Sequence, residues 1–368
     1  MSADSVIVPF VDLAAQYQEI KVDFLLQLDA LGASGHYILG EQVLQFEKEL
    51  ASFCESKHVI AVANGSDALF LVLKALGIGP GDEVITAPNS FVASAWVIAA
   101  AGATPRYCEV DEGFNLDPKH LAKTITKRTK AIIPVHLAGI PCKIEEIVNI
   151  AREHQIEVVE DCAQAIGARY RNQHVGNFGI AGGFSLHPLK NLGVLGDGGF
   201  LTTNDSNLDT RIRLLRNHGL VDRDHVKLWG YNSRLDEIQA LIGRLKLRHL
   251  NAWNVRVREI ASIYQKTLST IVETLKVPSD SLPVWHNFLI FTEKRDNLRN
   301  YLLTRGIDTR VHYPIPIHLQ EVHGNEYVRG SFPKAEYQST NSLSLPIYPT
   351  LTDHQVEAVT TAVKDFFE

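Results

Sequence analysis

A single lysine stands in an apolar, glycine-rich stretch of the sequence. The segment FSLHPLKNLGVLGDGGF, residues 184–200, surrounds Lys190 with apolar residues, glycines, a proline and a few small polar groups. An exposed lysine on a loop is the simplest interpretation, because most lysine side chains lie in solvent. The alternative is chemical: in apolar or cationic surroundings an ammonium group loses its proton more easily, and the amine then acts as a nucleophile and a general base. The groups that the fold brings to Lys190 decide between the two.

Small polar groups directly follow several predicted strands. Strand-like segments alternate with helical ones through the first 250 residues, which predicts a mostly parallel central sheet with helices on both faces. In open sheets of this kind, ligands bind beyond the carboxyl ends of the strands. The groups at those ends are Gly65 and Ser66 after the strand 59–63, Asp161 and Gln164 after the strand 156–160, and Ser185 and Lys190 after a short strand around Phe184.

These groups match the chemical needs of pyridoxal 5'-phosphate. Gly65 lets the backbone approach a ligand, and the start of the helix beside it attracts a phosphate, although Ser66 as a plain N-cap is the alternative. Asp161 would hold a proton on a ring nitrogen, unless it serves only as a cap or a pairing group. Gln164 would bond a phenolic oxygen of the same ring, and Lys190 would form a Schiff base with its aldehyde.

The composition bounds the architecture and the partners. The chain has 368 residues, 45% of them hydrophobic, which is ample for a packed core and long for a single one, so we expect two domains. Its net charge is −6 and no segment concentrates basic residues, so we expect no nucleic-acid or anionic-membrane partner. No apolar run approaches the ~18 residues of a membrane span.

Cysteine and histidine spacing predicts a metal-free, reduced protein. The four cysteines form no C-x-x-C pair, and the fifteen histidines show no H-E-x-x-H spacing. The beginning of the sequence, MSADSVIVPF, lacks the basic start and apolar stretch of a signal peptide. We therefore expect a soluble, cytoplasmic protein with free thiols and no metal ion.

The pattern of elements changes near residue 250. Residues 251–268 predict a long helix, 296–305 a shorter one among strand-like pieces, and 351–368 a closing amphipathic helix. We therefore divide the chain into a large coenzyme-binding α/β domain with an N-terminal helical segment, residues 1–248, and a smaller C-terminal α+β domain, residues 249–368.

Ten segments carry a resemblance to a known family, in order along nearly the whole chain. They are FVDLAAQY, GHYILGEQV, VANGSDAL, GPGDEVITAPNSFVAS, TKAIIPVHLAG, VVEDCAQAIGA, FSLHPLKNLGVLGDGG, GYNSRLDEIQA, VHYPIPIH and LSLPIYP. Together they resemble the pyridoxal-phosphate-dependent nucleotide-sugar aminotransferases, often called the DegT-type family, of the aspartate-aminotransferase fold. The resemblance implies this transferase fold and a homodimer whose two active sites are shared between the subunits.

The resemblance also implies a role for individual positions. Lys190 corresponds to the Schiff-base lysine, Asp161 to the partner of the pyridinium nitrogen and Gln164 to the partner of the phenolic oxygen. The remaining cofactor-binding positions that it implies are Gly65, Ser66 and Ser185 at the phosphate, Phe91 at the face of the ring, and Asn232 at the phosphate in the neighbouring subunit's site.

A ping-pong reaction is implied by the same likeness. L-glutamate displaces Lys190 from its Schiff base, and the freed lysine moves the proton from the donor's α-carbon to the C4′ atom of the coenzyme. The donor leaves as a keto acid. A nucleotide-linked keto-sugar, with a hexose or deoxyhexose ring, then takes the amino group by the reverse path.

The signals for the position of amination conflict. His187, three residues before the lysine, matches relatives that aminate C-4, whereas GDGG (196–199) and HYPIPIH (312–318) resemble relatives that aminate C-3. We favour C-3. His187 is a candidate catalytic and substrate-binding residue and His312 a candidate substrate contact, although either histidine can equally be a packed, hydrogen-bonded loop residue.

Other functions stay open at this point. Related sugar dehydratases carry histidine in the position of Lys190, so the lysine argues against them. A regulatory protein of this fold would bind a nucleotide-sugar or the coenzyme without turnover, and an aminotransferase could act instead on a cyclitol ketone. The intact set of lysine, aspartate and glutamine favours an enzyme.

Overall fold

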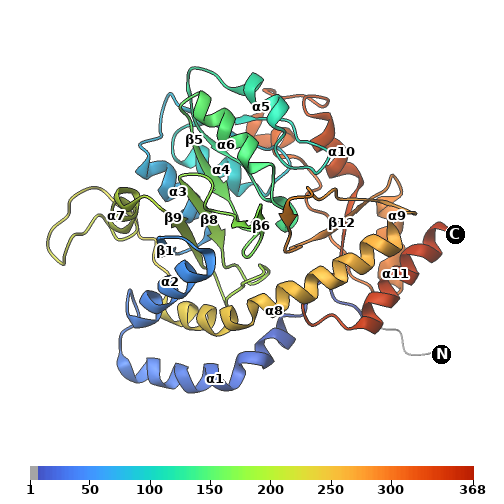
Figure 1. Cartoon of the computed structure of the whole chain (residues 1–368), viewed down its shortest axis with the longest axis horizontal. Coiled ribbons are helices and arrows are strands. Elements are labelled where there is room, and N and C mark those ends of the chain that lie inside the picture. Colours follow the sequence, from blue (N-terminus) through green and yellow to red (C-terminus); the bar gives the residue numbers. More distant parts are fainter. Residues whose placement is uncertain (1–6) are drawn as a thin grey trace.

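A seven-stranded sheet forms the centre of the computed structural model, which describes residues 7–368 (Figure 1). Its strands are β1 (His58–Val62), β2 (Glu83–Thr86), β3 (Thr104–Tyr107), β4 (Thr129–Ile133), β5 (Glu157–Asp161), β8 (Ala181–Ser185) and β9 (Gly199–Thr203). They lie in the order β1-β9-β8-β5-β4-β2-β3. β9 is antiparallel to both of its neighbours, and the other six strands run in one direction. The predicted mostly parallel sheet is confirmed.

Helices cover both faces of this sheet, as predicted. Side chains alternate along a strand, so each strand feeds two cores. In β1, Ile60 and Val62 pack with α3, α4 and α7, whereas Val59 and Ala61 pack with α1, α2 and α8. The helices are α1 (Leu13–Ser34), α2 (Glu41–Cys54), α3 (Gly65–Ala75), α4 (Ala93–Ala100), α5 (Pro118–Thr124), α6 (Ile144–Glu153), α7 (Ser206–Leu215), α8 (Glu237–Leu268), α9 (Arg295–Thr304), α10 (Pro333–Asn341) and α11 (Asp353–Phe367).

Two small sheets accompany the large one. The C-terminal part forms the sheet β10-β12-β13, from β10 (Glu273–Thr274), β12 (Phe288–Phe291) and β13 (Ser342–Leu345). The sheet β11-β6-β7 joins β11 (Ser281–Leu282) to β6 (Arg169–Tyr170) and β7 (Gln173–His174). The closing helix is confirmed as α11, with Val356, Val359 and Val363 buried.

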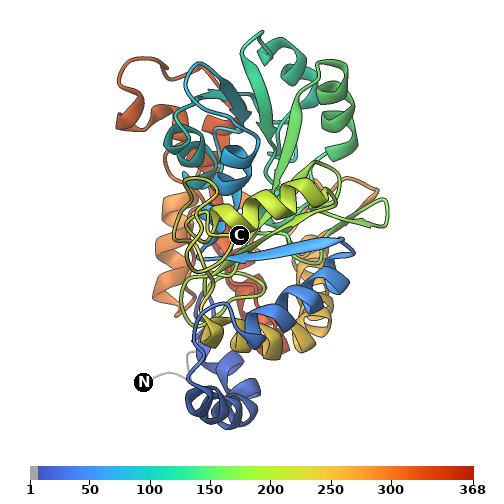
Figure 2. The same ribbon diagram turned by 90° about the vertical axis from the view of Figure 1, so that its left-hand side faces the viewer.

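Helix α8 connects the two parts of the chain. It runs along one side of the molecule from α2 to α11, and α1 packs beneath it at one end of the molecule (Figures 1 and 2). The predicted start at residue 251 is wrong, because the helix begins at Glu237. The single glycine of this earlier stretch, Gly243, faces the ring of Phe46, which leaves no room for a side chain. The predicted division at 248/249 falls inside this one helix and stays a prediction.

The N-terminus, the helices and the cysteines bear on three further predictions from the sequence. Residues 1–6, part of the segment searched for a signal peptide, lie outside the described residues. Within residues 7–368, none of the helices has the length and apolar character needed to span a bilayer. The four cysteines, Cys54, Cys108, Cys142 and Cys162, are buried and free.

A buried carboxylate fastens α2 to α8. Gly40 stands at the N-cap of α2 and has no side chain to cap it. Glu237, 1% exposed at the start of α8, takes this role: its Oε1 accepts the N–H groups of Gly40 at 2.8 Å and Val43 at 3.1 Å, and its Oε2 accepts that of Gln42 at 2.8 Å. A negative charge is favourable at a helix N-terminus, where N–H groups lack partners within the helix.

We expect the substitution Glu237→Ala to lower the free energy of unfolding by about 2–3 kcal/mol, because three backbone N–H groups lose their charged acceptor. Urea unfolding followed by circular dichroism measures the change. Glu259→Ala, on the exposed side of the same helix, is the matched control and should change stability by less than about 0.5 kcal/mol. Equal effects of the two substitutions would contradict the capping role.

Candidate active site

The polar groups at the strand ends meet in one cavity of about 500 Å³. Asp161 ends β5 and Ser185 ends β8, and these adjacent parallel strands bring both residues to the same edge of the sheet. The predicted site residues that line the cavity are Gly65, Ser66, Phe91, Asp161, Gln164, Ser185, His187, Lys190 and His312. The structure therefore brings together all the predicted site residues except Asn232.

The start of α3 forms one wall of the cavity. The N-cap of this helix is Asn64, whose Oδ1 accepts the N–H of Asp67 at 2.8 Å, so the alternative of Ser66 as the N-cap is wrong. Asp67 turns its carboxylate to Ser233 Oγ at 2.6 Å and does not line the cavity. The N–H groups of Gly65 and Ser66, in the first turn, are left at the cavity wall, where an anion would be favourable.

Gly65 is required by a close approach. A Cβ at this position would stand 2.7 Å from the Cβ of Ser185 and 2.9 Å from its Cα. Both contacts are shorter than real Cβ atoms make. The absence of a side chain thus lets the start of α3 and the end of β8 lie side by side.

Asp161 is a buried carboxylate, and none of the cationic side chains of residues 7–368 lies at hydrogen-bond distance from it. Its Oδ2 accepts the hydroxyl of Ser94 at 2.8 Å, and its Oδ1 accepts the N–H of Ala163 at 3.1 Å. Two neutral donors orient the group and leave acceptor capacity on both oxygens. A carboxylate so held can accept a further N–H in the cavity.

Gln164 and two aromatic rings lie on the same side of the cavity. Gln164 Oε1 accepts the N–H of Ala138 at 2.7 Å, which directs Nε2 toward the hydroxyl of Tyr313 at 3.4 Å. The rings of Tyr313 and Phe91 are 5.9 Å apart and tilted by 47°. Burial raises the pKa of Tyr313, so its hydroxyl stays protonated and can donate.

Lys190 is not an ordinary solvated lysine. Its side chain is only partly exposed and lines the cavity. Desolvation lowers the pKa of Lys190 to about 8, against the opposing effect of the Asp161 carboxylate. The amine can therefore lose its proton near neutral pH, as a nucleophile or base requires.

The histidines differ in their surroundings. His187 is exposed, and its Nδ1 accepts the N–H of Leu189 at 3.3 Å. His312 bonds Ser344 Oγ through Nδ1 at 2.9 Å, and burial lowers its pKa to about 4. Both rings reach the cavity, so both stay candidates for contact with a substrate.

Several other cavity residues were not predicted from the sequence, among them Ser94, Asp197, His286 and Tyr313. Ser94 and Tyr313 lie inside segments that carry the resemblance, and Asp197 lies in GDGG. Their place in these segments could have indicated that they belong to the site. His286 lies in the C-terminal part of the chain, outside those segments, and nothing in the sequence indicated that it belongs to the site.

Asn232 lies outside this cavity. Its side chain is exposed, next to a loop that also exposes Val221, Val226 and Trp229, the last at 92%. A position that serves a neighbouring subunit would be exposed in this way, and its role stays a prediction.

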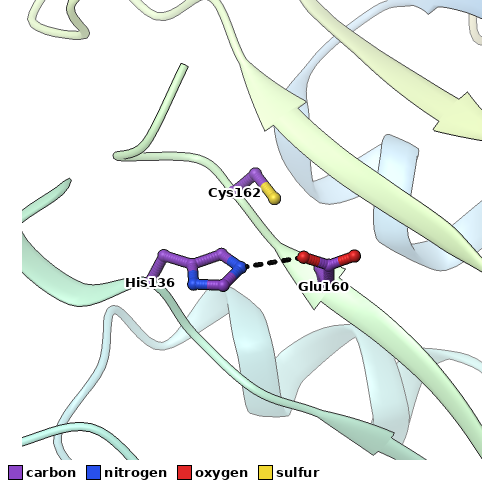
Figure 3. Close-up of side chains that lie close together, drawn as sticks. All are labelled: His136, Glu160 and Cys162. Atoms are coloured by element: carbon purple, nitrogen blue, oxygen red, sulfur yellow. Dashed lines mark hydrogen bonds and ion pairs between the residues drawn. The ribbon is translucent and has the colours of Figure 1, made fainter. Parts of the chain in front are cut away.

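A buried cluster next to Asp161 consists of His136, Glu160 and Cys162 (Figure 3). Its composition resembles that of a metal site, but His136 and Glu160 are already hydrogen-bonded to each other. His136 Nδ1 accepts the N–H of Cys142 at 3.1 Å, so Nε2 carries the proton and donates to Glu160 Oε2 at 3.0 Å. Glu160 also accepts backbone N–H groups of residues 176, 178 and 179. The backbone N–H of His136 donates to the carbonyl oxygen of Asp161 at 3.0 Å. The cluster therefore stabilises the end of β5.

Fold and cavity together define a class: a transferase that depends on pyridoxal phosphate. The residues fit this coenzyme, because a helix start, a carboxylate with free acceptor capacity and an easily deprotonated amine face one cavity. The chain belongs to the DegT/DnrJ/EryC1/StrS aminotransferase family, whose sequence pattern matches residues 18–364. It is a pyridoxal-phosphate-dependent sugar aminotransferase.

Individual relatives are similar over nearly the whole chain. The "dTDP-3-amino-3,4,6-trideoxy-alpha-D-glucose transaminase" of Streptomyces venezuelae is 43% identical, covering 98% of this chain and 96% of its own. The "Pleiotropic regulatory protein" of Geobacillus stearothermophilus is 42% identical, covering 98% of both chains. The crystal structure of S. venezuelae DesV in complex with a ketimine intermediate matches with a TM-score of 0.96 at 43% identity, covering 98% of this chain and 99% of that one.

We expect Lys190 of the coenzyme-free protein to react with trinitrobenzenesulfonate with a midpoint near pH 8. Only the neutral amine reacts, and lowering the pKa to about 8 makes about half of it neutral at that pH, against under roughly 1% for an ordinary lysine. Peptide mass spectrometry resolves the labelling of each lysine.

Asp161→Asn is the control for this measurement. It removes the charge that raises the pKa of Lys190, so the midpoint should fall further. A midpoint above pH 10 in the unaltered protein would refute the desolvated environment.

Proposed function

We propose that the protein transfers an amino group from L-glutamate to C-3 of a nucleotide-linked keto-sugar. The observation that carries the reaction type is the pair of Lys190 and Asp161 in one cavity beside the start of α3. The name of the S. venezuelae relative, a 3-amino-sugar transaminase, supports C-3 over C-4. Because His187 pointed to C-4, the position of amination is the finer part of the proposal.

The residues divide the chemistry among them. When bound, pyridoxal phosphate supplies an aldehyde that bonds to amines and a ring that accepts electrons from the donor's α-carbon. Gly65, Ser66 and Ser185 hold the phosphate through N–H and hydroxyl groups. Asp161 keeps the ring nitrogen protonated, and Gln164 donates through Nε2 to the phenolic oxygen.

Lys190 changes its task during the cycle. Its Nζ would hold the coenzyme covalently in the resting protein and would be free during the reaction with the donor. As a neutral amine it then accepts the proton from the donor's α-carbon and delivers it to C4′. The low pKa suits this task, because a permanently charged ammonium could not accept a proton.

The phosphate site also extends to a second subunit. We propose a homodimer in which Asn232 contacts the coenzyme phosphate of the partner. Support comes from the exposed Val221, Val226 and Trp229 beside it, since contiguous exposed apolar side chains mark interfaces. A cytoplasmic location is part of the proposal, supported by the four buried free thiols.

A regulatory role is the second candidate. The name of the G. stearothermophilus relative favours it, and a cyclitol ketone as acceptor is a variant of the first proposal. A protein that binds the coenzyme but shows no half-reaction with glutamate would support regulation. Turnover without affinity for any nucleotide would point to the cyclitol.

We expect the protein loaded with pyridoxal phosphate to be yellow, and glutamate to bleach its visible absorption. Borohydride should fix the coenzyme to Lys190, as peptide mass spectrometry would show. With 3-keto and 4-keto dTDP-, UDP- and GDP-sugars, NMR should locate the new amine at C-3. Lys190→Ala and the charge-preserving Lys190→Arg should both lose turnover by roughly 10²–10⁴-fold or more. Turnover by either variant at a rate close to that of the unaltered protein would contradict the role of the lysine, and an amine at C-4 would contradict that part of the proposal.

Hybrid dimers test the role of Asn232. Lys190→Ala and Asn232→Ala proteins are each expected to have low activity, and refolding them together should restore about a quarter of the sites, because each hybrid dimer has one intact site. Activity and light scattering are measured on the mixture. No recovery in a mixture of proven dimers would contradict the proposed contact of Asn232 with the partner's site.

A further inference from the structure

His286 stands beside the reactive lysine but has no part in the mechanism above. It lines the coenzyme cavity together with Lys190, and both residues also line a small chamber of about 40 Å³ on the other side. Leu189, Lys190 and His286 are the residues common to the two spaces. The imidazole and the lysine side chain therefore form part of one partition.

The loop that carries His286 is fastened to the loops of the active site. The N–H of Val284 donates to Gly139 O at 3.0 Å, and Asn191 Nδ2 donates to Val284 O at 3.1 Å. A Cβ on Gly139 would stand 2.9 Å from the backbone nitrogen of His286 and 2.8 Å from Gln164 O, so the glycine lets these loops touch.

The backbone just before the imidazole is unusual. Trp285 has φ at 48°, in the left-handed region that bulky residues rarely adopt. Such conformations persist where the surroundings enforce them, often at functional sites. Close contacts and hydrogen bonds thus hold the backbone that carries the His286 side chain.

The imidazole is available and uncharged. Among residues 7–368 no hydrogen bond to either of its ring nitrogens is found. Burial, and after it the charge of Lys190, lowers the pKa of His286 well below its usual range. The other titratable groups facing the cavity are Asp161, Asp197, His187, His312 and Tyr313.

We propose that His286 is the positioning residue for Lys190, its neutral ring bonding Nζ whenever the amine is free and aiming it into the cavity. This rests on the proposed role of the lysine. A neutral imidazole has one donor and one acceptor, so it can bond an amine in either sense. A carboxylate in its place would hold the lysine as an ammonium, which cannot accept a proton.

Three substitutions separate the contributions. His286→Asn keeps a neutral donor and acceptor, His286→Phe keeps a ring without either, and His286→Asp adds a charge. In coenzyme-free protein, the labelling midpoint of Lys190 should stay near that of the unaltered protein in His286→Asn and rise by one pH unit or more in His286→Asp. His354→Asp, on the exposed side of α11, introduces the same charge far from the cavity and should leave the midpoint unchanged.

The loaded enzyme gives the second measurement. The rate of the half-reaction with glutamate should fall about tenfold or more in His286→Phe and recover largely in His286→Asn, while the glutamate concentration for half-maximal rate changes little. An unchanged midpoint in a folded His286→Asp protein, or an unchanged rate in His286→Phe, would overturn the proposal. If glutamate gives no half-reaction in the unaltered protein, the proposed donor fails, and the labelling midpoints still decide the role of His286.

Discussion

The desolvated space that Lys190 and Asp161 share is the constraint on which the site depends. In water an ammonium and a carboxylate would each be solvated and inert. Here Asp161 ends β5, Lys190 follows the end of the neighbouring parallel strand β8, and neutral donors hold the carboxylate. Burial weakens the hold of Lys190 on its proton. By positioning these two groups in the same cavity, the sheet keeps Asp161 available as an acceptor and allows Lys190 to be a neutral, reactive amine.

Much of this arrangement could be predicted from the sequence, because it follows from strand order. Asp161 and Ser185 each end a strand and Gly65 closely follows one, and strands of one direction bring their carboxyl ends to one edge. The resemblance added Phe91 and His312, which no local pattern marked. The residues at strand ends were predictable because the strand before each of them determines its position in the fold, and the others because their segments match those of the family.

The rest depends on contacts between distant segments. Ser94 and His286 reach the cavity only through tertiary packing, and the capping of α2 by Glu237 joins residues nearly 200 positions apart. Asn64 rather than Ser66 caps α3, since the choice between adjacent polar residues depends on where the chain turns. The predicted start of α8 was too late, since the helix begins at Glu237, where Gly243 packs directly against the ring of Phe46.

The length of α8 has a consequence for access to the site. At 32 residues the helix is about 48 Å long, and it packs against α1 and α2 at one end and α11 at the other. An unbroken rod of this kind resists bending, so the two parts of the chain cannot swing apart about a hinge within it. Any opening of the cavity for a ligand must therefore come from segments other than α8, such as the side chains and short loops that line it.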